Sequence, residues 1–328
     1  MISVSDVETR KLQAVGGGTV TVSLPKQWAT DHDLDAGAEV TLYRHADESI
    51  VVRGPDADGA ALKRVRIAVR DDSPERVRRT LRAAHAAGFE TATLDAAGGS
   101  FTTEQRRAAR RVADRLTGAA VETAVSGTIR LRALLDTAEV SIRQSVEQLR
   151  FLALSVHREG TAAALGGDPD GESSDRLAER AAAATRLSGT VDRHLERSLV
   201  SLGEVDDLGV SRPALLDCGV AARALDRVAT HGVRLARAAG DEGVPETAAD
   251  RVRTRAEAAR DVVAAATDAV LRDGDADAAH DALDSAAEIE RDAPADPRAG
   301  QAWECLAQTA DAGETIARAA LRADVRER

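Results

Sequence analysis

The sequence predicts a multidomain protein that combines α+β and all-α parts: a β-rich N-terminal segment, a small α+β middle domain and a helical C-terminal half. Residues alternate between apolar and polar from Thr19 to Leu24, which is the period of a half-buried strand. From Leu135 onward, apolar residues recur at three- and four-residue steps, which is the period of an amphipathic helix. Aromatic residues make up only 2% of the chain, so its cores must be built mainly from alanine, leucine and valine.

The N-terminal segment, residues 1–54, is predicted to form two pairs of short strands joined by a short helix. Gly16–Gly18 predict a turn with positive φ before the second strand. The helix is expected from about Gln27, with its end signalled by Asp35–Gly37. The alternation then returns at Val40, Leu42 and Ile50–Val52. A unit with so little apolar surface rarely folds alone, so we expect an intertwined dimer.

Three short motifs in this segment carry a resemblance to a known family. They are R-K-x-Q, G-G-G-T-V-T-V-S-L-P-K-x-W and L-D-A-G-A-E-V. In this order they resemble the SpoVT/AbrB swapped-hairpin domain, in the form found at the front of archaeal PhoU-like phosphate-uptake regulators. The resemblance implies a dimeric swapped-hairpin β-barrel that binds operator DNA through Arg10, Lys11, Gln13 and Lys26. The alternative is that Arg10 and Lys11 are ordinary strand-edge charges and Lys26 is the solvated start of a helix.

The charge of the chain bears on this expectation. The net charge is −11, and only Lys11, Lys26 and Lys63 are lysines among 44 basic residues, a composition that resembles haloarchaeal cytoplasmic proteins. In molar salt the Debye length falls to about 3 Å, so a DNA-binding face there need not be strongly basic. We expect a cytoplasmic protein without membrane insertion, because the sequence has no run of eighteen apolar residues and no signal-peptide pattern.

The middle domain is predicted over residues 62–133, after a polar linker at 54–59. The expected elements are a strand at Val65–Val69, a helix capped by Ser73 and running to about Ala87, a strand at Phe89–Leu94, a helix at Thr103–Thr117, and two strands flanking Ser126-Gly127. Arginines crowd both helices: Arg76, Arg78, Arg79 and Arg82, then Arg106, Arg107, Arg110 and Arg111. They form either a second phosphate-contacting surface or anionic effector site, or, as we favour, solvated faces that pair with acidic residues elsewhere.

The helical half is predicted to contain two tandem three-helix bundles, over residues 134–242 and 243–328. The helix breaks are expected at 166–171, 203–213, 240–245, 273–275 and 292–297. The stretches L-D-T-A-E-V-S-I-R at 135–143 and A-R-A-L-D-R-V-A-T-H at 222–231 resemble PhoU. This resemblance implies regulation of phosphate uptake, through contact with the ATPase of the phosphate transporter or with another signalling protein.

PhoU bundles also hold metal clusters through the pattern E/D-x-x-x-D, and here this chain departs from the family. Asp226 is followed by Thr230 where a second acid is expected, and Asp311 is preceded by Ala307. We therefore predict no tight multinuclear site and name no cofactor. Asp226 and Asp311 are the remaining carboxylates that a divalent metal could use, or they are helix-surface aspartates without a ligand.

No catalytic motif of the forms G-x-S-x-G, P-loop, H-E-x-x-H or Cys/His dyad occurs, so we do not expect an enzyme. The combined prediction is a phosphate-responsive transcription regulator that works as a homodimer or a higher even oligomer. One alternative is an adaptor that inhibits the phosphate ABC transporter, with the N-terminal domain only dimerising. A further alternative is an antitoxin-like repressor, which we favour less because the helical half is too long for a disordered toxin-binding tail.

Overall fold

The computed structural model describes residues 8–44, 50–54, 60–70, 73–123, 127–134, 137–166, 172–238, 242–272, 274–289, 294 and 296–328. The chain divides into two compact units, Met1–Asp58 and Gly59–Arg328. Several predicted boundaries lie wholly or partly outside the described residues: the linker at 54–59, Ser126, Leu135, and the helix breaks at 166–171, 240–245, 273–275 and 292–297.

The described residues of the first unit form two separate two-stranded sheets and one short helix. Strand β1 (Gln13–Val15) pairs with β2 (Thr19–Thr21), and β3 (Thr41–Arg44) pairs with β4 (Ile50–Arg53), both antiparallel. The predicted glycine turn is confirmed by a φ of 66° at Gly16 and 135° at Gly18. The strand expected to reach Leu24 ends at Thr21, because β1 offers only three residues for pairing. Among the described residues of one copy, these sheets do not close into the expected barrel.

Helix α1 (Lys26–Asp31) ends before the predicted signal at Asp35–Gly37. Asp33 adopts a left-handed φ of 53°, and the N–H groups of Asp33 and Leu34 donate to the carbonyl oxygens of Thr30 at 3.2 Å and Ala29 at 2.8 Å. This double hydrogen bond ends many helices, usually with glycine at the left-handed position. Because this position holds an aspartate and not a glycine, the sequence does not indicate that the helix ends here.

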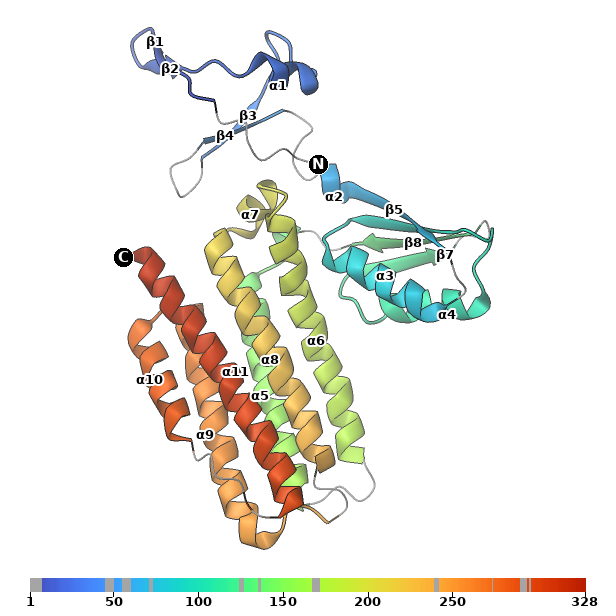
Figure 1. Cartoon of the computed structure of the whole chain (residues 1–328), viewed down its shortest axis with the longest axis vertical. Helices are drawn as coiled ribbons and strands as arrows, with labels where there is room; N and C mark the ends of the chain where they lie inside the picture. Colours follow the sequence, from blue (N-terminus) through green and yellow to red (C-terminus); the bar gives the residue numbers. More distant parts are fainter. Residues whose placement is uncertain are drawn as a thin grey trace. The chain divides into compact units, whose positions relative to one another are not determined.

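The second unit begins with short helix α2 (Ala60–Lys63) and a four-stranded sheet. The strands are β5 (Arg64–Val69), β6 (Thr91–Ala96), β7 (Ala119–Thr123) and β8 (Thr128–Ala133), in the order β5-β6-β8-β7. Strands β5 and β6 are parallel, and the other pairs are antiparallel. Helices α3 (Pro74–Ala86) and α4 (Thr103–Ala113) lie on one side of the sheet (Figure 1). Leu81 of α3 is buried there in one cluster with Leu94 of β6 and Ile129 of β8.

These elements confirm the predicted α+β pattern, with one shortened helix and with β6 at Thr91–Ala96 instead of Phe89–Leu94. The Ser73 hydroxyl accepts a hydrogen bond from the Arg76 N–H at 3.4 Å, so it caps α3 as expected. Helix α4 ends at Ala113 instead of Thr117. The N–H groups of Arg115 and Leu116 each bond a carbonyl three residues back, which tightens the last turn out of α-helical geometry.

The described residues of the C-terminal half form six long helices and two short ones. The long helices are α5 (Ile142–Gly166), α6 (Glu172–Ser198), α8 (Arg212–Ala238), α9 (Glu246–Leu271), α10 (Ala276–Glu288) and α11 (Pro297–Glu327), and the short ones are η1 (Thr137–Glu139) and α7 (Gly203–Leu208). The helix expected from Leu135 therefore begins at Ile142. No helix within the described ranges has the length and apolar composition needed to cross a membrane.

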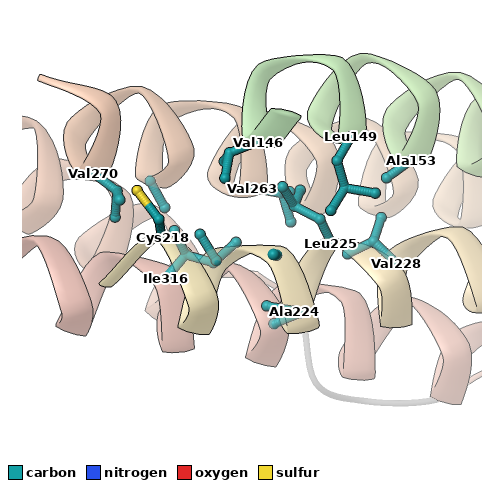
Figure 2. Close-up of a cluster of buried hydrophobic side chains, with 14 of the residues drawn as sticks. Val146, Leu149, Ala153, Cys218, Ala224, Leu225, Val228, Val263, Val270 and Ile316 are labelled. Atoms are coloured by element: carbon teal, nitrogen blue, oxygen red, sulfur yellow. The ribbon is translucent and has the colours of Figure 1, made fainter. Parts of the chain in front are cut away.

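The long helices pack as two groups of three around a shared core. Helices α5, α6 and α8 contact one another, as do α9, α10 and α11, while α8 also packs on α11 and α5 on α9. Figure 2 shows Leu149 of α5, Leu225 of α8, Val263 of α9 and Ile316 of α11 in one buried cluster. The apolar core is thus continuous between the two groups.

Gly232 of α8 and Gly313 of α11 occupy equivalent places in the two groups. A Cβ on Gly160 would lie 1.9 Å from the carbonyl oxygen of Gly232, so α5 and α8 touch backbone to backbone. A Cβ on Gly313 of α11 would lie 2.6 Å from Val262 of α9. In both groups the third long helix therefore approaches the first at a glycine. The stretches L-D-R-V-A-T-H-G at 225–232 and L-A-Q-T-A-D-A-G at 306–313 carry these glycines, which supports the predicted internal repeat.

Candidate nucleic-acid interface

The four residues predicted to contact DNA lie on the surface of the first unit. Arg10 and Lys11 precede β1, Gln13 begins it, and Lys26 is the first residue of α1; all four are exposed. Arg10 forms an ion pair with Glu8. Among the described residues, no hydrogen bond or ion pair joins any two of the four. Their side chains are thus available to a ligand, with Arg10 partly neutralised.

The apolar side chains of this unit are also exposed. Only Gly54 is buried among its described residues. The large exposed apolar residues are Leu12, Val15, Val20, Val22, Leu24, Val40, Leu42 and Ile50. Leu42 and Ile50, on the paired strands β3 and β4, are 63% and 65% exposed. One copy of this unit therefore has no hydrophobic core of its own in the described residues.

Two of the arginines on the helices of the middle domain, Arg78 and Arg79, have a local partner. Glu75, in the first turn of α3, accepts hydrogen bonds from Arg78 at 2.7 Å and from Arg79 at 2.9 Å. These contacts fit the interpretation of a solvated helix face for Arg78 and Arg79. The paired acid belongs to their own helix and not to the helical half.

A polar junction fastens the α+β domain to helix α6. Arg193 is buried and donates to the carbonyl oxygens of His85 and of Phe89, the latter at 3.0 Å. Arg197 donates to the carbonyl oxygen of Gly88 at 2.8 Å. Burial, with a smaller effect of Arg197, lowers the pKa of Arg193 to about 10, so Arg193 stays cationic at neutral pH. The two arginines thus donate to one carbonyl group in the last turn of α3 and to two in the segment that follows it.

Glu204 completes this junction from α7. It is 3% exposed and accepts hydrogen bonds from His194 at 2.5 Å and from Arg197 at 2.8 Å. Burial alone would raise the pKa of Glu204, but the hydrogen bonds from His194 and Arg197 outweigh it and lower the pKa overall. A cavity of about 430 Å³ adjoins the junction and is lined in part by His85, Arg193 and Arg197.

The two aspartates named as remaining carboxylates for a divalent metal belong to no ligand cluster among the described residues. Asp226 accepts a hydrogen bond from Thr185 at 2.8 Å, and burial raises the pKa of its carboxyl group. Asp311 is exposed. His231, which lies five residues after Asp226, contacts the Thr309 hydroxyl at 3.0 Å instead. Within the described residues no group of three or more His, Cys, Asp or Glu side chains is arranged to hold a metal ion.

Comparison with known proteins places only the N-terminal segment. Residues 13–55 match the family described as antidote-toxin recognition MazE, bacterial antitoxin. This segment is thus a MazE/AbrB-like domain, consistent with the SpoVT/AbrB-like domain expected from its motifs, and it supports a DNA-binding or antitoxin-like regulatory role. No curated protein and no solved structure matches the chain.

Sequence reasoning missed one group of basic residues. Arg64 and Arg66 of β5 and Arg130 and Arg132 of β8 line a shallow groove on the sheet of the middle domain. The available signal was an arginine at every second position in both strands, which places all four on one face. The prediction considered only the helix arginines.

Proposed function

We propose that this chain is a homodimeric DNA-binding transcription regulator of phosphate uptake, without catalytic activity. Two copies of the N-terminal unit would close one small barrel, and its basic edge at Arg10, Lys11, Gln13 and Lys26 would contact operator DNA. The helical half would report phosphate status through contact with the transporter ATPase or another signalling protein. The exposed apolar surface of the MazE/AbrB-like domain is the observation that carries this proposal.

Dimerisation is supported by the energetics of that surface. Eight large apolar residues of the first unit are between 37% and 69% exposed in one copy. Covering them would contribute on the order of 1 kcal/mol each. The short pairs β1-β2 and β3-β4 leave strand edges available for pairing, and an isolated two-stranded hairpin is marginally stable. A second copy offers both the strand partners and the apolar cover.

Contact with DNA is supported by the class of the domain and by the exposed side chains near β1. Lys11 and Lys26 are exposed, and no ion-pair partner occupies either of them among the described residues. Positive charges of this kind contact phosphates and position a protein on a duplex, while Gln13 could also donate to a base edge.

The phosphate-sensing part of the proposal rests on the resemblance of the helical half to PhoU. The packing of six long helices around one core gives a rigid body through which a partner could act. In a dimer, the helical halves of the two copies could be arranged in more than one way. A partner that binds one of these arrangements more tightly would shift the population toward it and so change the affinity for DNA. The junction at Arg193 and Arg197 fixes the α+β domain to this body, so movement of α6 is passed on to that domain.

The test is fluorescence anisotropy of the full chain on duplexes from upstream of phosphate-transport genes, in high potassium salt and against random duplexes. The variant R10A/K11A/K26A should weaken operator binding at least tenfold and reduce the salt slope by about 0.9 for each lost phosphate contact. Arg44→Ala, which removes an exposed charge from β3, is the control and should change affinity less than twofold. Equal weak binding to operator and random duplexes would contradict the proposal.

The adaptor alternative makes a different prediction for the same variant. If the N-terminal domain only dimerises, R10A/K11A/K26A would leave phosphate-dependent expression unchanged. Loss of transporter capture on disrupting the helical half would then support the adaptor.

An antitoxin-like repressor is the second candidate, and the family match at residues 13–55 favours it. The chain beyond this domain is unlike a disordered toxin-binding tail, since the described residues after 137 form long helices around a buried core. An antitoxin of this build would have to offer a folded surface to its toxin. Co-purification of a small toxin with the native chain would favour this candidate over the phosphate regulator.

A further inference from the structure

The sheet of the middle domain has one face that no helix of that domain covers. Val69, Leu94, Ile129 and Leu131 point to the face that packs against α3 and α4. Because side chains alternate along a strand, their neighbours point to the opposite face. On β5 and β8 these neighbours include Arg64, Arg66, Arg130 and Arg132, all exposed. We call this surface, together with Thr91 and Thr93 of β6, the arginine face.

The strand register arranges these residues in two rows. Thr91 lies opposite Arg64 on one side and Arg132 on the other. In the next row, Thr93 lies opposite Arg66 and Arg130. Neighbouring strands are about 4.8 Å apart, and alternate residues on a strand are about 6.7 Å apart. Each row therefore presents one guanidinium group on each side of a hydroxyl, in a groove of about 560 Å³.

The arginine face keeps a net positive charge in an acidic protein. Arg66 is neutralised by a bidentate salt bridge to Asp95, with N–O distances of 2.7 and 3.0 Å. Glu122 of β7 lies 3.5 Å from both Arg130 and Arg132, at an exposed site where such pairs contribute little. Arg64 has no ion pair in the described part of the chain. Counting Asp95 and Glu122, four arginines face two carboxylates, while the whole chain carries −11.

We propose that the arginine face binds the phosphate backbone of duplex nucleic acid without reading its sequence. Guanidinium and hydroxyl groups are the donors that most often contact phosphates. The two rows contain no aromatic or large apolar side chain that could stack on bases or anchor a protein partner. The positive charge of the arginine face is complementary to a polyanion. It is also opposite in sign to the net charge of a second copy of this chain, which is −11. That complementarity alone would also suit an acidic protein, but the absence of an apolar anchor favours phosphates.

This contact goes beyond the proposed function, because it does not depend on the N-terminal unit. If that unit binds an operator, the arginine face adds affinity for any flanking duplex. If it does not, the face still binds duplex by itself. The two proposals can thus fail separately.

The test is binding of the full chain to a random duplex, measured by anisotropy over a series of salt concentrations. The variant R64A/R130A/R132A removes three exposed arginines and leaves the Arg66–Asp95 pair intact. We expect at least a tenfold loss of affinity and a salt slope reduced by about two to three. The variant R79A/R82A/R107A removes the same charge from α3 and α4 and should lose less than threefold.

Two results would overturn the proposal. Equal losses in the two variants would mean that total charge, and not the arginine face, governs binding. Unchanged duplex binding by R64A/R130A/R132A would show that the arginine face does not bind duplex. If the sedimenting mass of this variant is also lowered, the face is a protein interface. Adding R10A/K11A/K26A to both variants separates the two proposals, because the difference between them should persist in that background.

Discussion

Arg197 of α6 donates a hydrogen bond to the carbonyl oxygen of Gly88 at 2.8 Å, so the helical half binds the backbone just after helix α3 of the α+β domain. Arg193, one turn earlier on α6, does the same for His85 and Phe89. The two parts of the second unit are therefore held by directional bonds between charged donors and backbone acceptors. Such bonds are stronger than neutral ones and fix orientation.

The substitution Arg193→Ala should destabilise the second unit, because it leaves the carbonyl oxygen of Phe89 without its side-chain donor and leaves that of His85 with only the Gly88 N–H. We expect a loss of about 2–4 kcal/mol in the free energy of unfolding. Urea denaturation followed by circular dichroism measures it. Arg227→Ala, which removes an exposed arginine from α8, should cost less than about 0.5 kcal/mol. If Arg193→Ala also cost less than about 0.5 kcal/mol, the junction would contribute little to the free energy of unfolding.

Helix contact through glycine gives a second stability prediction. Gly160→Ala should destabilise the chain by about 3 kcal/mol, since its Cβ would overlap the carbonyl oxygen of Gly232 and force α5 and α8 apart. Gly189→Ala on α6 is the matched control, because a Cβ there meets no atom within 4 Å. It should stabilise the helix by about 0.5–1 kcal/mol. Thermal unfolding of both variants checks the opposite signs.

A buried histidine pair predicts how stability depends on pH. His157 and His231 both contact the Thr309 hydroxyl, at 3.1 and 3.0 Å. Burial, with a smaller contribution from Arg260, lowers the pKa of His157 to about 3, and burial with Arg234 and Arg227 lowers the pKa of His231 to about 4. Both values lie below about 6.5 for an unfolded histidine, so the unfolded chain takes up protons first as the pH falls.

The free energy of unfolding should therefore have its full value above about pH 6.5 and decrease as the pH falls from there to 4. His231→Gln should make this decrease shallower, by up to about 1.4 kcal/mol per pH unit. The measurement is the free energy of unfolding in urea at pH 7, 6, 5 and 4 for both proteins. Parallel curves would mean that His231 has the same pKa in the folded and the unfolded chain.

The exposed apolar residues of the first unit predict a variant that separates the copies. L42D/I50D places two charges in the surface that a second copy would cover, and should convert the dimer to a monomer at micromolar concentration. Phe151→Asp charges an equally exposed apolar residue of α5, which is 77% exposed, and should leave the mass unchanged. Sedimentation equilibrium distinguishes the chain mass of 34.4 kDa from its double. A dimer that survives L42D/I50D would place the interface elsewhere.

Much of the fold is encoded in local sequence signals, and the exceptions have physical causes. Alternation and caps predicted every strand of the middle domain and the start of α3 at Ser73. The early end of α1 was missed, because Asp33 adopts the conformation that glycine usually takes. The shared core of the helical half was missed as well. Helical periodicity identifies an apolar face, but not which of five other helices covers it.

The candidate site was predictable only in part. Strand pairing brings Arg64 and Arg132 to either side of Thr91, although 68 positions separate them in the chain. Such a surface depends on strand order, which no local pattern contains. The junction at Glu204 has the same origin, since it assembles α6, α7 and the end of α3. By contrast, the family resemblance of the N-terminal motifs identified Lys11 and Lys26, and the small apolar surface of their unit predicted a second copy.

The central claim is that residues 13–55 complete their fold only with a second copy. Intermolecular nuclear Overhauser effects, recorded on dimers refolded from differently methyl-labelled chains, test it most directly. The account predicts strong effects between copies at Val20, Leu42 and Ile50. Effects confined to single copies, with these methyl groups ordered, would contradict it.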